Sequence, residues 1–316
     1  MGLPLQKTMK YLDLYQSGEL LERVREGYCR LAACDLCPHH CGVNRLKGEQ
    51  GRCRSGLQPR IASANLHRGE EPPISGSRGS GTIFFSGCTL RCAFCQNFPI
   101  SQQGSGETMP TRVLARRMLQ LQKRGAHNLN LVTPSHWLPQ ILAALWLAIP
   151  QGFNLPIVWN SSGYETVDAL RLLDGIVNIY LPDMKYSDDL QAEELSGASG
   201  YREINRQAVQ EMLRQVGHLQ MDDSGIARQG LIVRHLVLPL SRAGSAETLP
   251  WIAENLGQDT HIALMSQYFP ADRANNMEGI NRGIFHDEYD AAVEALEEAG
   301  LENGWVQELD EERGSV

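Results

Sequence analysis

The sequence predicts an α/β fold: a partial (β/α)6 barrel of the TIM type with an N-terminal helical, cysteine-rich metal-binding extension. Three observations support this prediction. Short apolar runs with strand character recur through the chain after residue 81. Each run is followed by a stretch with helical spacing, and this alternation produces parallel sheets with both faces covered. All eight cysteines lie between Cys29 and Cys95, before or at the start of the alternating part.

The alternating part contains six predicted strand–helix units. The strands are expected at residues 82–85, 129–132, 156–159, 176–181, 231–236 and 262–265. The helices are expected at residues 112–123, 138–147, 165–173, 189–195 together with 203–216, 246–256 and 288–299. Six units are too few to close an eight-stranded barrel, so we expect either a partial barrel or a doubly wound open sheet. In both architectures the chemistry gathers at the carboxyl ends of the strands.

The N-terminal part differs in pattern from the rest. Apolar residues between positions 5 and 28 recur with rough helical spacing, which predicts a helix or a helix pair. Residues 34–53 are rich in cysteine and glycine, as is typical of a small module organised by a metal. The stretch 70–81 is rich in proline and glycine and is expected to be a loop. We therefore predict an N-terminal module at 1–69, a core at 70–285, and a C-terminal helix with an acidic tail at 286–316.

Composition limits the class of protein. The chain has 316 residues, 42% of them hydrophobic, and a formal net charge of −8. An acidic chain offers no electrostatic attraction for nucleic acid or a membrane surface, so neither partner is expected. No apolar run is as long as the roughly 20 residues that a spanning helix needs, and the first residues do not resemble a secretory signal. A cytoplasmic protein is expected.

Three cysteines directly follow the first predicted strand. Cys88, Cys92 and Cys95 have the spacing C-x3-C-x2-C, which suits metal ligands in a reducing compartment better than disulfides. Three thiolates can bind three irons of a [4Fe-4S] cubane and leave the fourth iron open to another molecule. A zinc site completed by a distant fourth ligand is the alternative.

The segment GCTLRCAFCQN, residues 87–97, resembles the cluster loop of the radical S-adenosylmethionine (SAM) superfamily. More narrowly, it resembles the pyruvate formate-lyase activating enzymes and their poorly characterised homologues, over roughly residues 81–271. The resemblance implies that the open iron binds the amino and carboxylate groups of SAM. An electron from the cluster then cleaves SAM to methionine and a 5′-deoxyadenosyl radical, while the protein positions SAM and excludes water.

The resemblance also implies SAM-binding residues at two strand ends. Thr133 and Ser135 stand where the superfamily usually has a Gly-Gly-Glu segment, and they offer acceptors for the SAM amino group. A helix cap is the alternative role. Asn160 and Ser162 belong to an N-S-S-G stretch that is similar to the turn facing SAM in the activating enzymes. An ordinary strand-to-helix turn is the alternative there.

Three further strand ends carry candidates. Asp183 and Lys185 resemble a D-x-K segment in which the lysine approaches the SAM carboxylate and the aspartate lies by the sugar or a bound cation. Charged side chains after so apolar a run favour a functional role. Arg234 is part of an R-H pair expected near the SAM ribose, with a structural pair as the alternative. Tyr268, or its neighbour Phe269, stands where the activating enzymes often have a histidine near the adenine.

A second set of cysteines precedes the first strand. Cys34, Cys37, Cys41 and Cys53 have the number of ligands of a closed four-coordinate site, and both zinc and an auxiliary Fe–S cluster fit. His39 or His40 could replace one thiolate. Cys29, outside the set, is expected to be a buried apolar side chain.

The leading functional hypothesis is a radical SAM oxidoreductase that cleaves SAM and activates a glycyl radical enzyme, as the resemblance implies. It would take electrons from a donor such as flavodoxin or ferredoxin. Radical modification of another peptide or of a small molecule is the second hypothesis. A non-SAM Fe–S electron-transfer or interaction protein is the third, and the open-iron motif together with the Asp183 and Lys185 pair argues against it.

Overall fold

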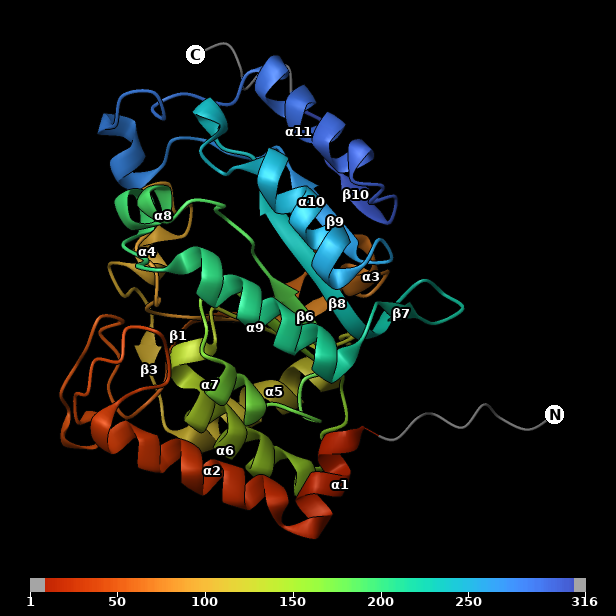
Figure 1. The fold of residues 1–316 in the computed structure, drawn as a ribbon. Coiled ribbons are helices and arrows are strands. Elements are labelled where there is room, and N and C mark those ends of the chain that lie inside the picture. Colours follow the sequence, from red (N-terminus) through yellow and green to blue (C-terminus); the bar gives the residue numbers. More distant parts are fainter. Residues whose placement is uncertain (1–8, 310–316) are drawn as a thin grey trace.

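The computed structural model describes residues 9–309, and its centre is a ten-stranded sheet (Figure 1). The strands are β1 (Arg60–His67), β2 (Ser80–Phe85), β3 (Glu107–Thr108), β4 (Leu129–Val132), β5 (Ile157–Ser161), β6 (Ile179–Pro182), β7 (Gln220–Met221), β8 (Ala227–Leu236), β9 (His261–Met265) and β10 (Gly304–Val306). Their order is β10-β9-β8-β6-β5-β4-β2-β1-β3, with β7 paired to β8. Neighbours from β2 to β10 are parallel, whereas β1, β3 and β7 pair antiparallel. The sheet does not close, because β3 and β10 lie at its two ends.

The helices connect the parallel strands and pack on the sheet and on one another. They are α1 (Lys10–Ser17), α2 (Glu19–Cys29), α3 (Pro72–Ser75), α4 (Phe98–Ser101), α5 (Thr111–Lys123), α6 (Leu138–Ala148), α7 (Val167–Arg171), α8 (Asp189–Ser196), α9 (Tyr201–Val216), α10 (Ser245–Leu256) and α11 (His286–Glu298). The helix α6 packs against both α5 and α2, and α10 packs against α11. Figure 1 shows α9 running alongside β6 and β8.

Apolar side chains cover both faces of the central strands. Trp159 and Tyr180 belong to the main core with the helices. Val158 and Ile179, the next residues toward the amino end of β5 and β6, belong to a second cluster with Ile74 of α3. Alternate residues of a strand face opposite sides, so the short helix α3 covers the face that the long helices do not.

The six predicted strand–helix units are confirmed as β2, β4, β5, β6, β8 and β9 with their helices, in an open parallel sheet. Two bounds differ from the prediction. The strand expected at 176–181 begins only at Ile179, because the apolar residues Ile176 and Val177 are buried in the turn that follows α7. The helix expected at 165–173 is the shorter α7.

The N-terminal helix pair is confirmed as α1 and α2, although residues 5–8 of that prediction lie outside the described part. The expected loop at 70–81 contains the buried helix α3, which starts with Pro72 and Pro73, because proline is tolerated in a first helical turn. The strand β1 was not predicted, and it pairs with β2 of the core sheet. The three-part division of the chain stays a prediction. The helix α11 is confirmed, and the acidic tail from residue 310 lies outside the described part.

Across residues 9–309, none of the helices combines the length and the apolar character needed to cross a membrane.

Candidate active site

The cluster loop, residues 86–97, begins at the carboxyl end of β2. Its entry depends on Gly87, which has a left-handed φ of +84° and whose Cβ, if present, would lie 2.7 Å from the Cys53 carbonyl oxygen. The backbone therefore brings the cluster loop against the N-terminal module. Cys88, Cys92 and Cys95 are all half-buried on this loop.

The three thiols of the cluster loop lie near one another. Burial raises the pKa of Cys88, and Cys92 and Cys95 add to the rise. Burial also raises the pKa of Cys92, against the opposing effect of Lys185. Ser196 donates a hydrogen bond to the Cys92 Sγ atom at 3.0 Å. Thiols of raised pKa become ligands when a metal displaces their protons.

The described residues hold no group of three or more His, Cys, Asp or Glu side chains arranged to hold a single metal ion. A [4Fe-4S] cluster makes a different demand, because each thiolate binds a different iron atom. The three neighbouring thiols of the cluster loop, two of which are influenced by Lys185, fit that demand.

Asp183 joins the carboxyl end of β6 to β8. Its Oδ2 lies 2.7 Å from Nζ of Lys185, and its Oδ1 lies 2.9 Å from Nη2 of Arg234. Burial by itself raises the pKa of Asp183, but Arg234 and Lys185 outweigh burial and hold it below its usual value. Burial lowers the pKa of Lys185, and the attraction of Asp183 and then of Cys92 outweighs it and raises that pKa. The lysine therefore remains charged between the carboxylate and the cluster loop.

The strand β8 places its two candidate residues on opposite sides. Arg234 points to Asp183, whereas His235 is buried and bonds to the Met184 carbonyl oxygen at 2.7 Å and to Ser245 at 2.9 Å. Burial lowers the pKa of His235 to about 4, so the ring is neutral at physiological pH. Of the pair, only Arg234 faces the predicted SAM residues.

The end of β4 places Thr133 and Ser135 differently. Thr133 has a left-handed φ of +56°, a strained conformation for a β-branched residue, and its N–H donates to the Asn160 carbonyl oxygen at 2.9 Å. Ser135 instead donates to the buried carboxyl of Glu165 at 2.7 Å. Trp159 and Ser161 donate to the same carboxyl, so the Ser135 hydroxyl belongs to a buried network.

Asn160 lies in β5 near its carboxyl end, and Ser162 directly follows that strand, at the same edge of the sheet. The Asn160 side chain donates to Oε2 of Glu70 at 3.5 Å. The Ser162 carbonyl oxygen accepts from the Tyr201 hydroxyl at 3.0 Å. The structure thus places Asn160 beside an acid that the sequence analysis did not select.

The two aromatic residues after β9, Tyr268 and Phe269, differ in exposure. Tyr268 is buried, its hydroxyl donates to the Ile280 carbonyl oxygen at 2.6 Å, and its ring centroid lies 5.6 Å from that of Phe94 in the cluster loop. Phe269 is 44% exposed. Tyr268 therefore packs against Phe94 on the buried side of the cluster loop.

Three polar residues, Glu70, Glu71 and Asn130, were missed by the sequence analysis. Burial raises the pKa of Glu70, and Arg234 is the strongest influence that opposes it. Glu71 and Asn130 carry buried side-chain atoms that have no partner among residues 9–309. The sequence signal for Asn130 was a polar residue inside the apolar run of β4. Asn130 pairs with Val158 of β5, so both residues lie on the face of the sheet that α3 covers.

In the N-terminal module, Cys34, Cys37, Cys41 and Cys53 line one small pocket. Burial raises the pKa of Cys37 to about 12, and the other three thiols add to the rise. The histidines of this stretch are engaged elsewhere or exposed. His39 Nε2 lies 2.7 Å from the Thr89 carbonyl oxygen, and His40 is exposed.

The expectation for Cys29 was wrong. It is exposed at the end of α2, because the apolar residues of that helix that face the core, such as Leu20, lie on the other side.

Comparison with known proteins gives two findings for the sequence. Residues 75–199 match a family model described as a 4Fe-4S single cluster domain. Over 276 residues the chain is 32% identical to the uncharacterized protein MJ0674 of Methanocaldococcus jannaschii. The match covers 85% of this chain and 75% of the relative. The chain belongs to the MJ0674 family.

Three solved structures with some likeness to the chain have TM-scores below 0.5. TYW1 with a lysine-pyruvate adduct bound has a TM-score of 0.42 at 13% identity, covering 69% of this chain and 73% of that chain. HydG, a maturase of the [FeFe]-hydrogenase, has a TM-score of 0.45 at 11% identity, covering 69% and 48%. HydG from Carboxydothermus hydrogenoformans has a TM-score of 0.44 at 13% identity, covering 68% and 49%.

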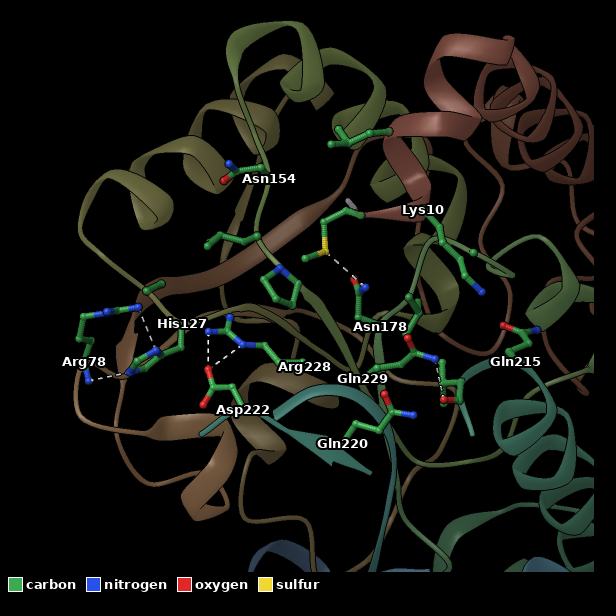
Figure 2. Close-up of a pocket in the computed structure, with 18 of the residues that line it drawn as sticks. Lys10, Arg78, His127, Asn154, Asn178, Gln215, Gln220, Asp222, Arg228 and Gln229 are labelled. Carbon is green, nitrogen blue, oxygen red and sulfur yellow. Dashed lines mark hydrogen bonds and ion pairs between the residues drawn. The ribbon is translucent and has the colours of Figure 1, made fainter. Parts of the chain in front are cut away.

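In this member of the MJ0674 family, the matched cluster domain contains Cys88, Cys92, Cys95, Asp183 and Lys185, whereas the four N-terminal cysteines lie outside it. A cavity of about 790 Å³ lies elsewhere, at the amino ends of the strands (Figure 2). Its polar lining pairs Arg78 with His127 and Asp222 with Arg228. That cavity is at the opposite end of the sheet from the cluster loop, so it is not part of the candidate active site.

Proposed function

We propose that this protein is a radical SAM enzyme that holds a [4Fe-4S] cluster on Cys88, Cys92 and Cys95. The observation that carries the proposal is the three-thiol loop at the end of β2 with charged Lys185 beside it. The match of residues 75–199 to a 4Fe-4S single cluster domain supports it. When bound, the cluster and SAM together supply the reductive cleavage that yields a 5′-deoxyadenosyl radical.

The chain's own residues then bind and orient SAM. The Asp183 carboxylate faces two cations, Lys185 and Arg234, so the three together carry a net positive charge suited to the SAM carboxylate. Asn160 and Thr133, at adjacent strand ends, offer polar groups on the same edge of the sheet. Ser162, Ser135 and Tyr268 hold the neighbouring backbone and the cluster loop in place.

Anaerobic reconstitution with iron and sulfide, followed by SAM and dithionite, tests the proposal. We expect 5′-deoxyadenosine from the wild-type protein and from a Cys29→Ala control, because the exposed Cys29 is not a ligand. A Cys88→Ala/Cys92→Ala/Cys95→Ala variant should form none, since it lacks the thiolates that anchor the cluster. Product from the triple variant, or none from a wild-type protein with a full cluster, would refute the proposal.

We further propose a protein substrate, a glycyl radical enzyme, as the partner of an oxidoreductase of the activating-enzyme type. The open sheet is compatible with this choice because an unclosed barrel can admit a loop of another protein. It admits a large small molecule equally well, so radical modification of another peptide or of a small molecule is the second candidate. Mass spectrometry of co-purifying proteins, and loss of a substrate glycine hydrogen in deuterium-labelling experiments, separates the two.

The same proposal includes a reducing, cytoplasmic setting and a flavodoxin or ferredoxin as electron donor. It also includes a second metal, zinc or an Fe–S cluster, on Cys34, Cys37, Cys41 and Cys53. Support for the second metal comes from the shared pocket of these four side chains. Metal analysis of the Cys37→Ser/Cys41→Ser variant tests it.

A further inference from the structure

Four cysteine side chains line the pocket of the N-terminal module. Cys34 and Cys37 are buried, and Cys41 and Cys53 are half-buried around the same space. The packing is close: a Cβ atom on Gly51 would lie 2.6 Å from the Cys41 Sγ atom. The Arg52 N–H donates to that sulfur at 3.4 Å. Backbone donors to sulfur are a feature that tunes thiolate-ligated clusters.

A buried cation, Arg45, lines this pocket. Its side chain is 1% exposed and places Nη1 3.9 Å from the Cys34 Sγ atom. Its other donors reach carbonyl oxygens of His136 and Gly56, and its guanidinium lies 5.1 Å from the ring centre of Trp137. Among residues 9–309 no carboxylate forms an ion pair with Arg45.

A buried charge without a counter-charge is strongly unfavourable, so the surroundings of Arg45 call for an anion. Four neutral thiols do not supply one. Four thiolates on a metal centre do, because the thiolate charges exceed the charge of the metal core. The guanidinium therefore indicates that the pocket holds an anionic centre.

A buried histidine lies in the same wall. His136 lines the pocket and is 1% exposed, and its Nε2 lies 3.0 Å from the Ser86 carbonyl oxygen. A carbonyl accepts, so Nε2 carries the proton and Nδ1 carries the lone pair. That Nδ1 atom is buried and has no partner among the described residues. A lone pair is satisfied by a donor such as a water molecule, so the case for an anionic centre rests on Arg45.

The walls of this pocket are bonded directly to the cluster loop. His39, between Cys37 and Cys41, contacts the carbonyl oxygen of Thr89, the neighbour of Cys88. Arg91 of the cluster loop donates to the Arg52 carbonyl oxygen, next to Cys53, at 3.2 Å. These two hydrogen bonds join the N-terminal module to the cluster loop, and the bond from His136 to Ser86 joins a wall of the pocket to it. Two metal centres on adjoining loops are suited to passing electrons from one to the other.

Cations also gather where the two loops meet. Arg91 donates to the Arg52 carbonyl oxygen, and Arg273 donates to the Arg91 carbonyl oxygen, so three arginines lie close together in a chain of net charge −8. A positive field stabilises the more negative, reduced state of a cluster.

We propose that Cys34, Cys37, Cys41 and Cys53 hold a second [4Fe-4S] cluster, with Arg45 as its buried counter-cation, and that this cluster reduces the one on the cluster loop. The electron transfer between the two clusters, called the relay below, rests on the proposed function. The presence of the second cluster does not. A low-potential one-electron donor reduces the second cluster from the 2+ to the 1+ state. The electron then moves on, which returns the second cluster to 2+ and leaves the cluster of Cys88, Cys92 and Cys95 in the 1+ state.

Iron content separates this proposal from zinc and from free thiols. After anaerobic reconstitution we expect roughly eight irons per chain in the wild type and in the Cys29→Ser control, as two cubanes require. The Cys37→Ser/Cys41→Ser variant should keep roughly four irons and lose one of two electron paramagnetic resonance signals after reduction with dithionite. Retention of all iron, or loss of about one zinc instead, would overturn the second cluster.

A variant with Cys88, Cys92 and Cys95 changed to alanine distinguishes failure of this proposal from failure of the proposed function. It should keep roughly four irons and the second signal, whether or not the wild-type protein cleaves SAM. Loss of all iron from this variant while it remains folded by circular dichroism would overturn the second cluster. In Arg45→Met we expect the midpoint potential of that signal to fall, because a positive charge beside the cluster is removed, and an unchanged potential would exclude the counter-cation role.

The relay has its own readout. With reduced flavodoxin as the donor, the Cys37→Ser/Cys41→Ser variant should form the reduced cluster on Cys88, Cys92 and Cys95 more slowly than the wild type and the Cys29→Ser control. Freeze-quenched resonance spectra follow that cluster without requiring turnover. An equal rate in a variant that retains this cluster would refute electron transfer through the second one.

Discussion

The Nζ atom of Lys185 lies 2.7 Å from the Oδ2 atom of Asp183 at the carboxyl end of β6, where Asp183 is buried and Lys185 is half-buried. The pair is not an isolated salt bridge, because Arg234 binds the other carboxylate oxygen. One anion thus holds two cations from neighbouring strands beside the cluster loop. Because the three charges depend on one another, each substitution among them has a distinct expected result.

Changing Lys185 to alanine should weaken SAM binding while iron content stays at the wild-type value. The lost contact is charge-assisted, so we expect a change of about 1.5–3 kcal/mol, which is roughly ten- to hundredfold in dissociation constant. Equilibrium binding of SAM to the reconstituted protein measures it. The exposed Lys123→Ala is the control, and equal affinities for SAM in the two variants would assign Lys185 a structural role.

Changing Asp183 to asparagine should destabilise the fold at pH 7. The substitution leaves the half-buried Lys185 and Arg234 without their shared counter-charge, a loss of about 3–5 kcal/mol. Urea unfolding at pH 7 measures it. Asp168→Asn, which breaks an exposed pair with Arg171, should stay within about 0.5 kcal/mol of wild type. Similar stabilities for the two variants would contradict a tightly coupled charge cluster.

The sequence was sufficient for the strand–helix alternation because the signal there is local. Buried parallel strands such as β5 begin with a continuous apolar run, here residues 157–159, and their helices have apolar faces at regular spacing. It was not sufficient for β1, which has mixed composition and only a half-buried face and depends on pairing with β2. Nor did it predict α3, whose two prolines are as common in loops as in a first helical turn.

The candidate site shows the same division. The Asp183 and Lys185 pair was predicted because both charges follow an apolar strand and lie two positions apart. Glu70 and Arg45 were not, because each acquires meaning from residues far away in sequence: Arg234 for Glu70, and His136 and Trp137 for Arg45. Ser135 matched the expected strand end, but its hydroxyl is bonded to Glu165, a tertiary contact that spacing does not report.

Glu288 is expected to stabilise the start of α11 in a pH-dependent way. Its carboxylate accepts from the N–H groups of Phe285 and Leu240 and from Arg282. Burial raises its pKa, but the bonds from Arg282, Phe285 and Leu240 outweigh burial and lower the pKa to about 2. A lowered carboxylate pKa stabilises the folded state fully above the unfolded value of about 4.3. That stabilisation is lost as the pH falls toward 2.

Glu288→Gln should therefore be less stable than wild type by about 1–3 kcal/mol at pH 7, and the difference should shrink between about pH 4.3 and pH 2. Urea unfolding of both proteins at each pH gives the difference directly, and any cluster loss in acid is common to both. Glu297→Gln, on an exposed turn of α11, is the control. A difference that is constant with pH would show that Glu288 acts through its shape and not through its charge.

Gly163 lets the segment after β5 pass close to Asp183. It has a left-handed φ of +67°, and an added Cβ would lie 2.5 Å from the Asp183 carbonyl oxygen and collide with the Asn205 amide. Gly152 also has a left-handed φ, +89°, but an added Cβ there would meet nothing within 4 Å. The two glycines therefore share the conformational demand, and only Gly163 has the close approach.

Alanine at either position should cost about 1–2 kcal/mol for the left-handed backbone. Gly163→Ala should lose a further 1–3 kcal/mol, roughly, from steric overlap. It should also weaken SAM binding, because the Asp183 backbone must move to relieve the overlap. Urea unfolding and SAM binding, measured on both variants, separate the two effects. If Gly163→Ala matched Gly152→Ala in stability and in SAM affinity, the position of Asp183 would not depend on the close approach at Gly163.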